Sequence, residues 1–424
     1  MFSDRQAAQP VSLALPAAAP RFAPAAVGSD RPGRPIGWVR GLAGFRSDLR
    51  LQAIFWQVLI VGAAVAAGWY LASIATANLA QQHVATGFAF LQRTAGLPIG
   101  EHMIDYDPAI NTHGRALLVG ILNTLKVAAI GVVLSTLLGA VVGVAQLSDN
   151  WLLARLAESY VEVLRNIPLL LHLLFWYAIL LSLPVARNAI ELLPDVFLSN
   201  RGIRLPVPVW HPAYGWMIAV LAAGLAATVL AARRASRVQA STGRRPRIWP
   251  VACVALLVVP VATWMMLGAP FDLDVPVRDR FAFRGGSVIT PELAALVAGL
   301  VFYHSAYAAE IVRSGVQSVG PGQWDAGRAL GMCPYPIFSK IVLPQALRVI
   351  VPPMTGIYLG VAKNSSLAVA IGYPDVVTIV HGTMNQTGQA IEGVALIMLV
   401  YLGISLSISL FMNWYNARLA LVER

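Results

Sequence analysis

Runs of about 20 apolar residues recur along this chain of 424 residues, and they constrain its fold more than any other feature. A helix of that length spans a hydrocarbon core of ~30 Å. The composition agrees, because 57% hydrophobic and 12% charged residues lie outside the range of soluble domains. We therefore predict an all-α, polytopic membrane helix bundle. About eight transmembrane helices are expected, at roughly Ile54 to Ile74, Ala116 to Ala145, Val161 to Leu183, Tyr214 to Ala232, Ile248 to Leu267, Ile289 to Val312, Leu347 to Val361 and Ile391 to Met412.

The arginines predict how these helices are oriented. Six arginines with no acidic residue among them lie between the fourth and fifth apolar runs, at Arg233, Arg234, Arg237, Arg244, Arg245 and Arg247. Cytoplasmic loops carry an excess of Lys and Arg, so this loop is expected in the cytosol. Alternation along the chain then predicts that both termini are cytoplasmic and that the acidic segments 191–195 and 271–279 lie outside. Because the arginines alternate with apolar runs and form no basic face, the net charge of +11 does not indicate nucleic-acid binding.

The first part of the chain differs from the rest. Residues 1–50 are rich in Ala and Pro and contain scattered arginines, which predicts a disordered basic cytoplasmic arm. The first apolar run begins too far from the amino terminus for a signal peptide and is long enough to span. Residues 51–115 are therefore predicted to form a first transmembrane helix and a periplasmic loop, which carries Glu101, Asp105 and Asp107.

Reactive and metal-binding residues are sparse. Cys253 and Cys333 form neither a disulfide framework nor a metal-binding spacing, and the seven histidines are scattered. None of the three lysines follows a phosphate-binding glycine loop. These observations predict no metal site, no catalytic residue and no cofactor in this chain.

One polar segment inside the membrane protein has fixed internal spacing. Asp325-Ala326-Gly327 is followed by Gly331, and then by the run Ile341-Val342-Leu343-Pro344. Small residues allow close approach, and Gly331 can adopt the positive φ that ends a short helix. Pro334, Pro336 and Pro344 are expected to forbid one continuous helix, so that the segment turns, runs and turns again before it re-enters the bilayer.

This spacing resembles the EAA loop of ABC importer permeases, whose coupling helix docks on a cytosolic ATPase. Four further segments look like successive landmarks of the polar amino acid permease family of ABC importers. They are Asn123 to Leu125, Arg165 to Leu171, Ala306 to Arg313 and Lys363 to Leu367. The size and layout are most similar to the larger permease subunits of general L-amino-acid and glutamate/glutamine/aspartate/asparagine importers. The chain departs from the usual loop in having Asp325 in place of Glu and Gly327 in place of Ala.

The resemblance implies a type I ABC importer permease core and a division of the chain. Residues 116–424 are expected to form the permease domain, with an inserted helix pair at about 214–268 and the coupling loop at 317–345. ATPase coupling is carried over to Asp325, Ala326, Gly327, Gly331, Ile341, Leu343 and Pro344. The implied partners are a cytosolic ATPase dimer that binds ATP and Mg, a second permease subunit, a periplasmic amino-acid-binding protein and an amino acid substrate. The implied location is the bacterial inner membrane.

Two sets of charged residues allow two interpretations each. Glu162 with Arg165, and Glu310 with Arg313, are spaced i,i+3, so each pair can form along one helix face. They are either snorkelling pairs near the head groups or a brace for the coupling loop.

Lys363 is expected at membrane depth beside Asn364, Ser365 and Ser366, a segment that looks like a helix break. It is either an anchor at the outer interface or part of the wall of a translocation pathway that binds substrate carboxylates.

The predicted function is the transmembrane permease subunit of an ATP-driven amino acid importer. A stand-alone secondary transporter is the alternative, although it would need no docking loop and would carry more membrane carboxylates. A membrane enzyme is less favoured, because no catalytic constellation is assembled. The preferred amino acid, the identity of the second permease, and whether residues 374–386 insert or lie at the interface stay open.

Overall fold

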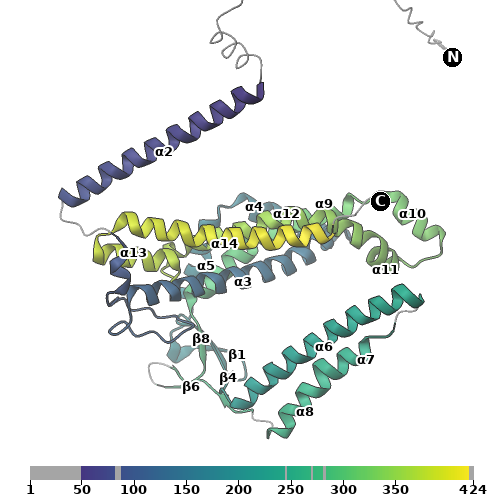
Figure 1. Ribbon diagram of the computed structural model, residues 1–424. Helices are drawn as coiled ribbons and strands as arrows, with labels where there is room; N and C mark the ends of the chain where they lie inside the picture. The colour runs from purple at the N-terminus through teal and green to yellow at the C-terminus, as the bar shows by residue number, and fades with distance from the viewer. Residues whose placement is uncertain (1–48, 82–86, 244–245, 269–270, 280–282, 420–424) are drawn as a thin grey trace, which may run out of the picture. The chain divides into compact units, whose positions relative to one another are not determined.

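The computed structural model describes residues 49–81, 87–243, 246–268, 271–279 and 283–419 (Figure 1). The chain divides into two compact units, residues 1–78 and 79–424. Apart from residues 49 and 50, the arm predicted at 1–50 lies outside the described residues, as does the carboxyl terminus beyond residue 419.

The first apolar run forms helix α2, Leu49–Gln81. Apolar residues occupy all of its faces, and residues 52–71 are long and apolar enough to cross a membrane. An evenly apolar helix suits a lipid environment, whereas a surface helix of a soluble protein carries a polar face. The prediction of a membrane-spanning length here is confirmed.

Four long helices of the second unit lie side by side in Figure 1. They are α3 (His113–Ala145), α9 (Pro291–Gln317), α12 (Leu343–Asn364) and α14 (Ala390–Leu419). Glycines let α3 approach α9 closely: a Cβ at Gly139 would lie 2.5 Å from the Ala308 Cβ, and one at Gly143 would lie 2.6 Å from the Ala309 carbonyl oxygen. Such small-residue contacts are typical of helix packing in membranes.

The third predicted span, Val161 to Leu183, is wrong as a single helix. The chain forms α4 (Trp151–Asn166) and α5 (Leu169–Leu181), which meet at an angle of 104°. Pro168 causes the break, because a residue before proline is disfavoured in the helical region, and Ile167 is extended at φ −101° and ψ 129°. The described residues therefore contain seven helices that could cross a membrane, or eight if the bent pair counts as one span.

The fourth and fifth predicted spans form a helix pair. Helix α6 (Pro212–Thr242) packs against α7 (Trp249–Cys253), the π-helix η3 (Val254–Val258) and α8 (Val259–Met266). The arginine-rich segment predicted as a loop is largely helical, because α6 continues through Arg237 and ends only at Gly243, with φ 69°. Arg244 and Arg245 lie outside the described residues.

Short strands, which were not predicted from the sequence, flank this helix pair. Strands β1 (Ile190–Leu193), β2 (Val196–Ser199), β3 (Gly202–Leu205) and β8 (Ser287–Ile289) form an antiparallel sheet in the order β1-β2-β3-β8. Strand β4 (Val207–Pro208) pairs with β5 (Leu273–Asp274), and β6 (Val277–Arg278) pairs with β7 (Phe283–Arg284). The chain thus leaves and re-enters the helix pair through neighbouring strands.

Short helices complete the fold. They are the 3-10 helices η1 (Phe88–Gln92), η2 (Ala186–Asn188) and η5 (Ser365–Ile371), the short helices α10 (Pro321–Ala329) and α11 (Pro334–Ile337), the π-helix η4 (Phe338–Val342), and α13 (Val376–Thr387). With 12 residues, α13 is too short to span a bilayer by itself. Figure 1 shows α13 at one end of the bundle and α10 at the other. We call these the distal end and the coupling end.

Candidate functional site

The segment at the coupling end has much of the predicted conformation. Helix α10 begins at Pro321 and ends before Gly331, whose φ is 70°. The Met332 amide donates to the Gly327 carbonyl at 3.1 Å, which closes the helix end. The prediction of a short helix that ends at a glycine with positive φ is therefore confirmed.

Small residues in α10 serve the internal packing of the segment. Gly327 is buried, and a Cβ at that position would lie 2.8 Å from Ile337 Cγ1. The Trp324 and Phe338 rings stack with centroids 6.5 Å apart. Both rings contact a core that contains Ile337 and Val342. We call the segment 321–342, which comprises α10, α11 and η4, the knuckle. It is rigid because α10 packs against α11 and η4.

The second turn expected at Pro344 does not form. From Pro334 to Ile371 the chain runs as one helical stretch, and Pro344 stands near the start of α12. A proline in a helix clashes with the carbonyl four residues earlier and lacks an amide donor. The preceding turn widens into the π-helix η4, which accommodates the proline. Of the predicted coupling residues, Ile341, Leu343 and Pro344 thus lie within a helix, where Ile341 and Leu343 are half-buried and Pro344 is exposed.

The outward surface of the knuckle carries charge and apolar bulk. Asp325 and Arg328 form an exposed ion pair at 3.7 Å. Leu330 and Tyr335 are each 78% exposed, and the sequence analysis did not single them out. These two side chains add apolar surface to the coupling end.

The two predicted helix-end pairs meet at one cavity of about 610 Å³ at the coupling end. Arg313 Nε donates to Glu310 Oε2 at 3.1 Å, so this pair is confirmed. The pair Glu162–Arg165 is not: within the described residues no ion pair joins them. The Arg165 guanidinium instead lies 5.0 Å from the ring centroid of Tyr307. Arg165, in the last turn of α4, thus faces Tyr307 of α9.

The segment from Lys363 to Ser366 is helical, and the break expected there is wrong. Helix α12 continues into η5, and the chain turns only at Gly372, with φ 77°. The Ser365 hydroxyl donates to the Ala362 carbonyl and the Ser366 hydroxyl donates to the Lys363 carbonyl, both at 2.8 Å. Ser365 is fully buried, while Lys363 is exposed. The four residues therefore do not share one face.

Asn364 has a partner that sequence reasoning missed. Its Nδ2 lies 3.2 Å from Nε2 of His304 in α9. His304 is 4% exposed, and a Cβ at Gly360 would lie 3.0 Å from its ring. Little in the sequence indicates this contact with His304, because a lone histidine in an apolar run forms no motif with a fixed spacing.

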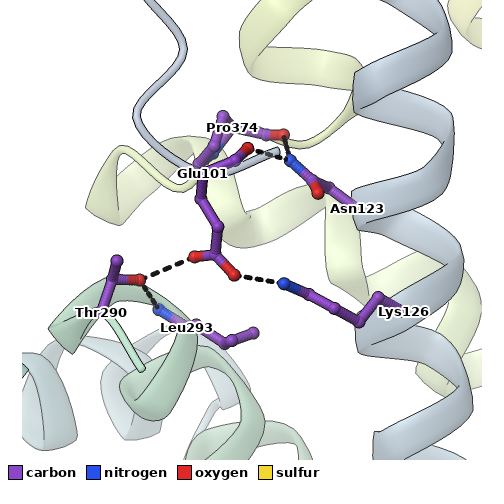
Figure 2. Close-up of polar contacts among 6 residues, drawn as sticks. All are labelled: Glu101, Asn123, Lys126, Thr290, Leu293 and Pro374. Carbon is purple, nitrogen blue, oxygen red and sulfur yellow. Dashed lines mark hydrogen bonds and ion pairs between the residues drawn. The ribbon is translucent and has the colours of Figure 1, made fainter. Parts of the chain in front are cut away.

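At the distal end, Glu101 joins α3 to the start of α9 (Figure 2). Its carboxylate forms an ion pair with Lys126 of α3 and accepts a hydrogen bond at 2.8 Å from the hydroxyl of Thr290, which caps α9. Its backbone carbonyl accepts from Asn123 Nδ2 at 2.8 Å, and the same amide donates to the Pro374 carbonyl at 2.9 Å. From the sequence Glu101 is expected only as an acidic residue of a periplasmic loop, because nothing along the chain connects it with Lys126.

The comparisons with known proteins agree on one family. The family model "Binding-protein-dependent transport system inner membrane component" matches residues 246–421. The putative amino-acid ABC transporter permease protein YhdX of Escherichia coli is 46% identical over 91% of this chain and 98% of its own length. The chain belongs to the permeases of amino-acid ABC transporters.

Two further relatives are similar along nearly their whole length. The general L-amino acid transport system permease protein AapQ of Rhizobium johnstonii is 44% identical over 90% of this chain and 96% of its own. The glutamate/glutamine/aspartate/asparagine transport system permease protein BztB of Rhodobacter capsulatus is 38% identical over 90% and 98%. A solved structure, "Crystal structure of an amino acid ABC transporter with histidines", is 20% identical with a TM-score of 0.44, over 72% of this chain and 95% of that one.

The Asn123-Thr124 landmark of this permease holds the η5–α13 turn. Besides the Asn123 contact, the Val376 amide donates to Thr124 Oγ1 at 3.2 Å. Asp375 caps α13 through the Thr378 amide at 2.8 Å and accepts from the Tyr401 hydroxyl at 3.3 Å. Burial raises the pKa of the Asp375 carboxyl, and its hydrogen bonds partly oppose that rise. The motif thus ties α3 to α13 and α14.

Proposed function

We propose that this permease is the larger membrane subunit of a multi-pass, inner-membrane importer of L-amino acids. In this proposal it lines the translocation pathway and couples it to a separate cytosolic ATPase. The observation that carries the proposal is the rigid knuckle of α10 and α11, which presents exposed Leu330 and Tyr335 at one end of the bundle. The near full-length similarity to AapQ and BztB supports an L-amino acid substrate, with polar and acidic side chains among those accepted.

The partners follow from the family's dependence on binding proteins. We propose that an ATPase dimer, which binds ATP and Mg, docks on the α10 surface, and that a periplasmic binding protein delivers the amino acid to the distal end. A second, paralogous permease completes the pathway. This chain itself is proposed to have no catalytic role and to bind no metal or cofactor.

Coupling requires that the knuckle contact the open and closed ATPase differently, because only a differential contact shifts a two-state equilibrium. Asp325, Ala326 and Gly331 would meet the ATPase, and Gly327 would serve coupling from inside by letting α10 pack closely on Ile337. Ile341, Leu343 and Pro344 would fix the knuckle to α12. The cavity lined by Glu162, Arg165, Glu310 and Arg313 lies against the same end of α9. We assign these four residues the role of bracing α9 as the knuckle moves.

For the pathway, we propose that Lys363 and Asn364 face the substrate and that Ser365 and Ser366 support the helix behind them. Lys363 is exposed in the last turn of α12, and Asn364 reaches His304 on α9. A lysine at membrane depth is expensive unless it lines a polar pathway or pairs with a group there.

The division of the chain stays as predicted from the sequence. We propose that residues 1–50 are a basic cytoplasmic arm, that 51–115 add a first helix and an outer loop, and that the helix pair near 214–268 is an insertion in the permease domain. The strand pairs β3–β8 and β4–β5 support an insertion, because they bring its two ends together.

The orientation has a direct test. If both termini and the end of α6 are cytoplasmic, a cysteine at Thr242 resists a membrane-impermeant thiol reagent added from the periplasmic side. Cys253 and Cys333, both exposed, are first replaced by serine. Ready labelling at position 242 would overturn the orientation.

The function is tested by uptake of labelled L-aspartate, L-glutamine and L-leucine into cells with and without this subunit. We expect uptake of at least one to depend on the chain and on ATP. Uptake that survives removal of the ATPase but requires this chain would instead favour the secondary-transporter alternative.

A further inference from the structure

A cavity of about 400 Å³ opens at the distal end beside Glu101. Its wall comes from the segment around Gly100, from the start of α9 at Thr290, and from the η5–α13 region, including Pro374 and Thr378. Glu292 of α9 is also part of the wall. The cavity thus has two carboxylates, those of Glu101 and Glu292, on its lining.

Glu101 lines this cavity and forms a charge pair with Lys126, which lies behind it on α3. Their side chains are 15% and 21% exposed, so both charges are largely removed from water. A pair of this kind loses much of its Coulombic attraction to desolvation, and an apolar pair of similar volume is often as stable. Holding the segment in place therefore does not by itself require two opposite charges.

Both charged groups, the Glu101 carboxylate and the Lys126 ammonium, have a neighbour that can stabilise them when an incoming group of opposite charge replaces the partner. Thr290 donates to the Glu101 carboxylate from the amino-terminal end of α9 (Figure 2). The Lys126 ammonium lies 6.0 Å from the ring centroid of Tyr373, which can stabilise the cation when its carboxylate partner moves. An amino acid is a zwitterion that carries one ammonium and one carboxylate. It can replace the internal pair by two new pairs, so that neither buried charge is left alone.

We propose that Glu101 receives the ammonium group and Lys126 the α-carboxylate of the transported amino acid as it enters from the distal end. The inference rests on the proposed function. In the empty state the two residues pair with each other. The pair then selects for zwitterions and is indifferent to the side chain, which fits a permease whose relatives include a general L-amino acid system.

The test uses a cysteine at Gly100, which lines the cavity and where an added Cβ meets nothing within 4 Å. In cells with the complete transporter and with Cys253 and Cys333 replaced by serine, the rate of labelling by an impermeant thiol reagent is measured. The probe is L-glutamine or L-leucine, whichever the uptake experiment shows to enter faster. At ten times its dissociation constant, it is expected to slow labelling about tenfold, because protection follows occupancy.

Analogues separate the two charges. For glutamine they are 4-carbamoylbutanoate, which lacks the amino group, and 4-aminobutanamide, which lacks the carboxylate. For leucine they are 4-methylpentanoate and 3-methylbutylamine. Neither analogue is expected to protect, and Glu101→Gln or Lys126→Met should abolish protection by the amino acid. Asp107→Asn is the matched control, because Asp107 belongs to the same segment and its carboxylate accepts from the nearby backbone amide of Ala109.

A second variant tests a bracing role. In Glu101→Lys/Lys126→Glu the pair can re-form with its polarity reversed, so a mere brace would recover uptake. We expect uptake to stay below about a fifth of wild type, since a zwitterion meets the wrong charge at each end.

Recovery of uptake in this double variant, or equal protection by the analogues, overturns the inference. If no uptake depends on this chain, the proposed function fails; if uptake depends on it but glutamine and leucine never protect, only this inference fails.

Discussion

The two ends of the bundle are built in opposite ways. At the coupling end, residues 318–344 fold on themselves: Gly327 packs on Ile337, and the ion pair Asp325–Arg328 is about 70% exposed on both sides. At the distal end, Glu101 contacts residues that are 25 and 189 positions away in the chain, with its charge largely buried. The difference teaches that one end is held together by contacts between neighbours in the chain and keeps its charges exposed, whereas the other holds distant parts of the chain together with a largely buried charge.

One helix connects these two ends. Helix α9 is capped by Thr290 at the distal end and leads into α10 at the coupling end. Its 27 residues span ~40 Å at a rise of 1.5 Å per residue. Helix α9 therefore links Glu101 to the short turn at residues 318–320 that precedes α10.

The largest expected effect is at the coupling end. Gly331→Asp should reduce uptake below about a tenth of wild type, because the positive φ adds strain of about 1–3 kcal/mol and the carboxylate must be desolvated at the docking surface. A Cβ at this position meets nothing within 4 Å, so the loss is not a packing defect. Uptake and binding-protein-stimulated ATPase activity in proteoliposomes give the measurement.

Gly331→Asn is the matched control, since asparagine has the same shape, tolerates the left-handed region and carries no charge. It should retain most of the uptake. If both variants transport normally, the comparison fails, because the coupling end would then not be a docking surface.

The next largest effect is expected at the distal end. Asn123→Ala leaves the carbonyls of Glu101 and Pro374 without their amide donor, at a cost of about 1–3 kcal/mol. The segment before α3 should open more often, and trypsin should cut at Arg93 about tenfold faster, because cleavage tracks the open population. In the control Asn166→Ala, an exposed amide loses only a contact within its own helix, and the rate should not change.

A smaller effect is expected for Lys363→Met, which keeps length and removes charge. Transport should fall about two- to fivefold, most for L-aspartate, because a cation at membrane depth favours an acidic substrate. Lys340→Met is the control, since Lys340 is also exposed but belongs to η4 at the coupling end. Unchanged relative uptake of aspartate, glutamine and leucine would make Lys363 an interfacial anchor.

The smallest effect is expected for Arg328→Gln. Its pair with Asp325 is long and exposed, so the free energy of unfolding should change by less than about 0.5 kcal/mol. Thermal unfolding of the purified complex in detergent provides the check. A loss as large as that of Asn123→Ala would show that the coupling end, too, depends on its charges for stability.

Much of the architecture could be read from contiguous stretches of sequence. The spans follow from runs of apolar residues, and the end of α10 follows from Gly331, because a helix end needs a local conformation that glycine adopts without strain. The bend at Pro168 was readable by the same kind of rule, since proline restricts the residue before it. It was missed because the apolar run on either side outweighed one proline.

Other features were decided only by the tertiary structure. Whether Pro344 turns the chain depends on the π-helix before it, which the packing of Ile337 and Val342 stabilises. That Arg165 meets Tyr307 and not Glu162 depends on the packing of α4 against α9. The sequence by itself determined a membrane bundle with a coupling knuckle, because hydropathy and backbone restrictions act locally. The pairing of Glu101 with Lys126 and Thr290 came only with the fold, because a charge finds its partner by distance in space and not along the chain.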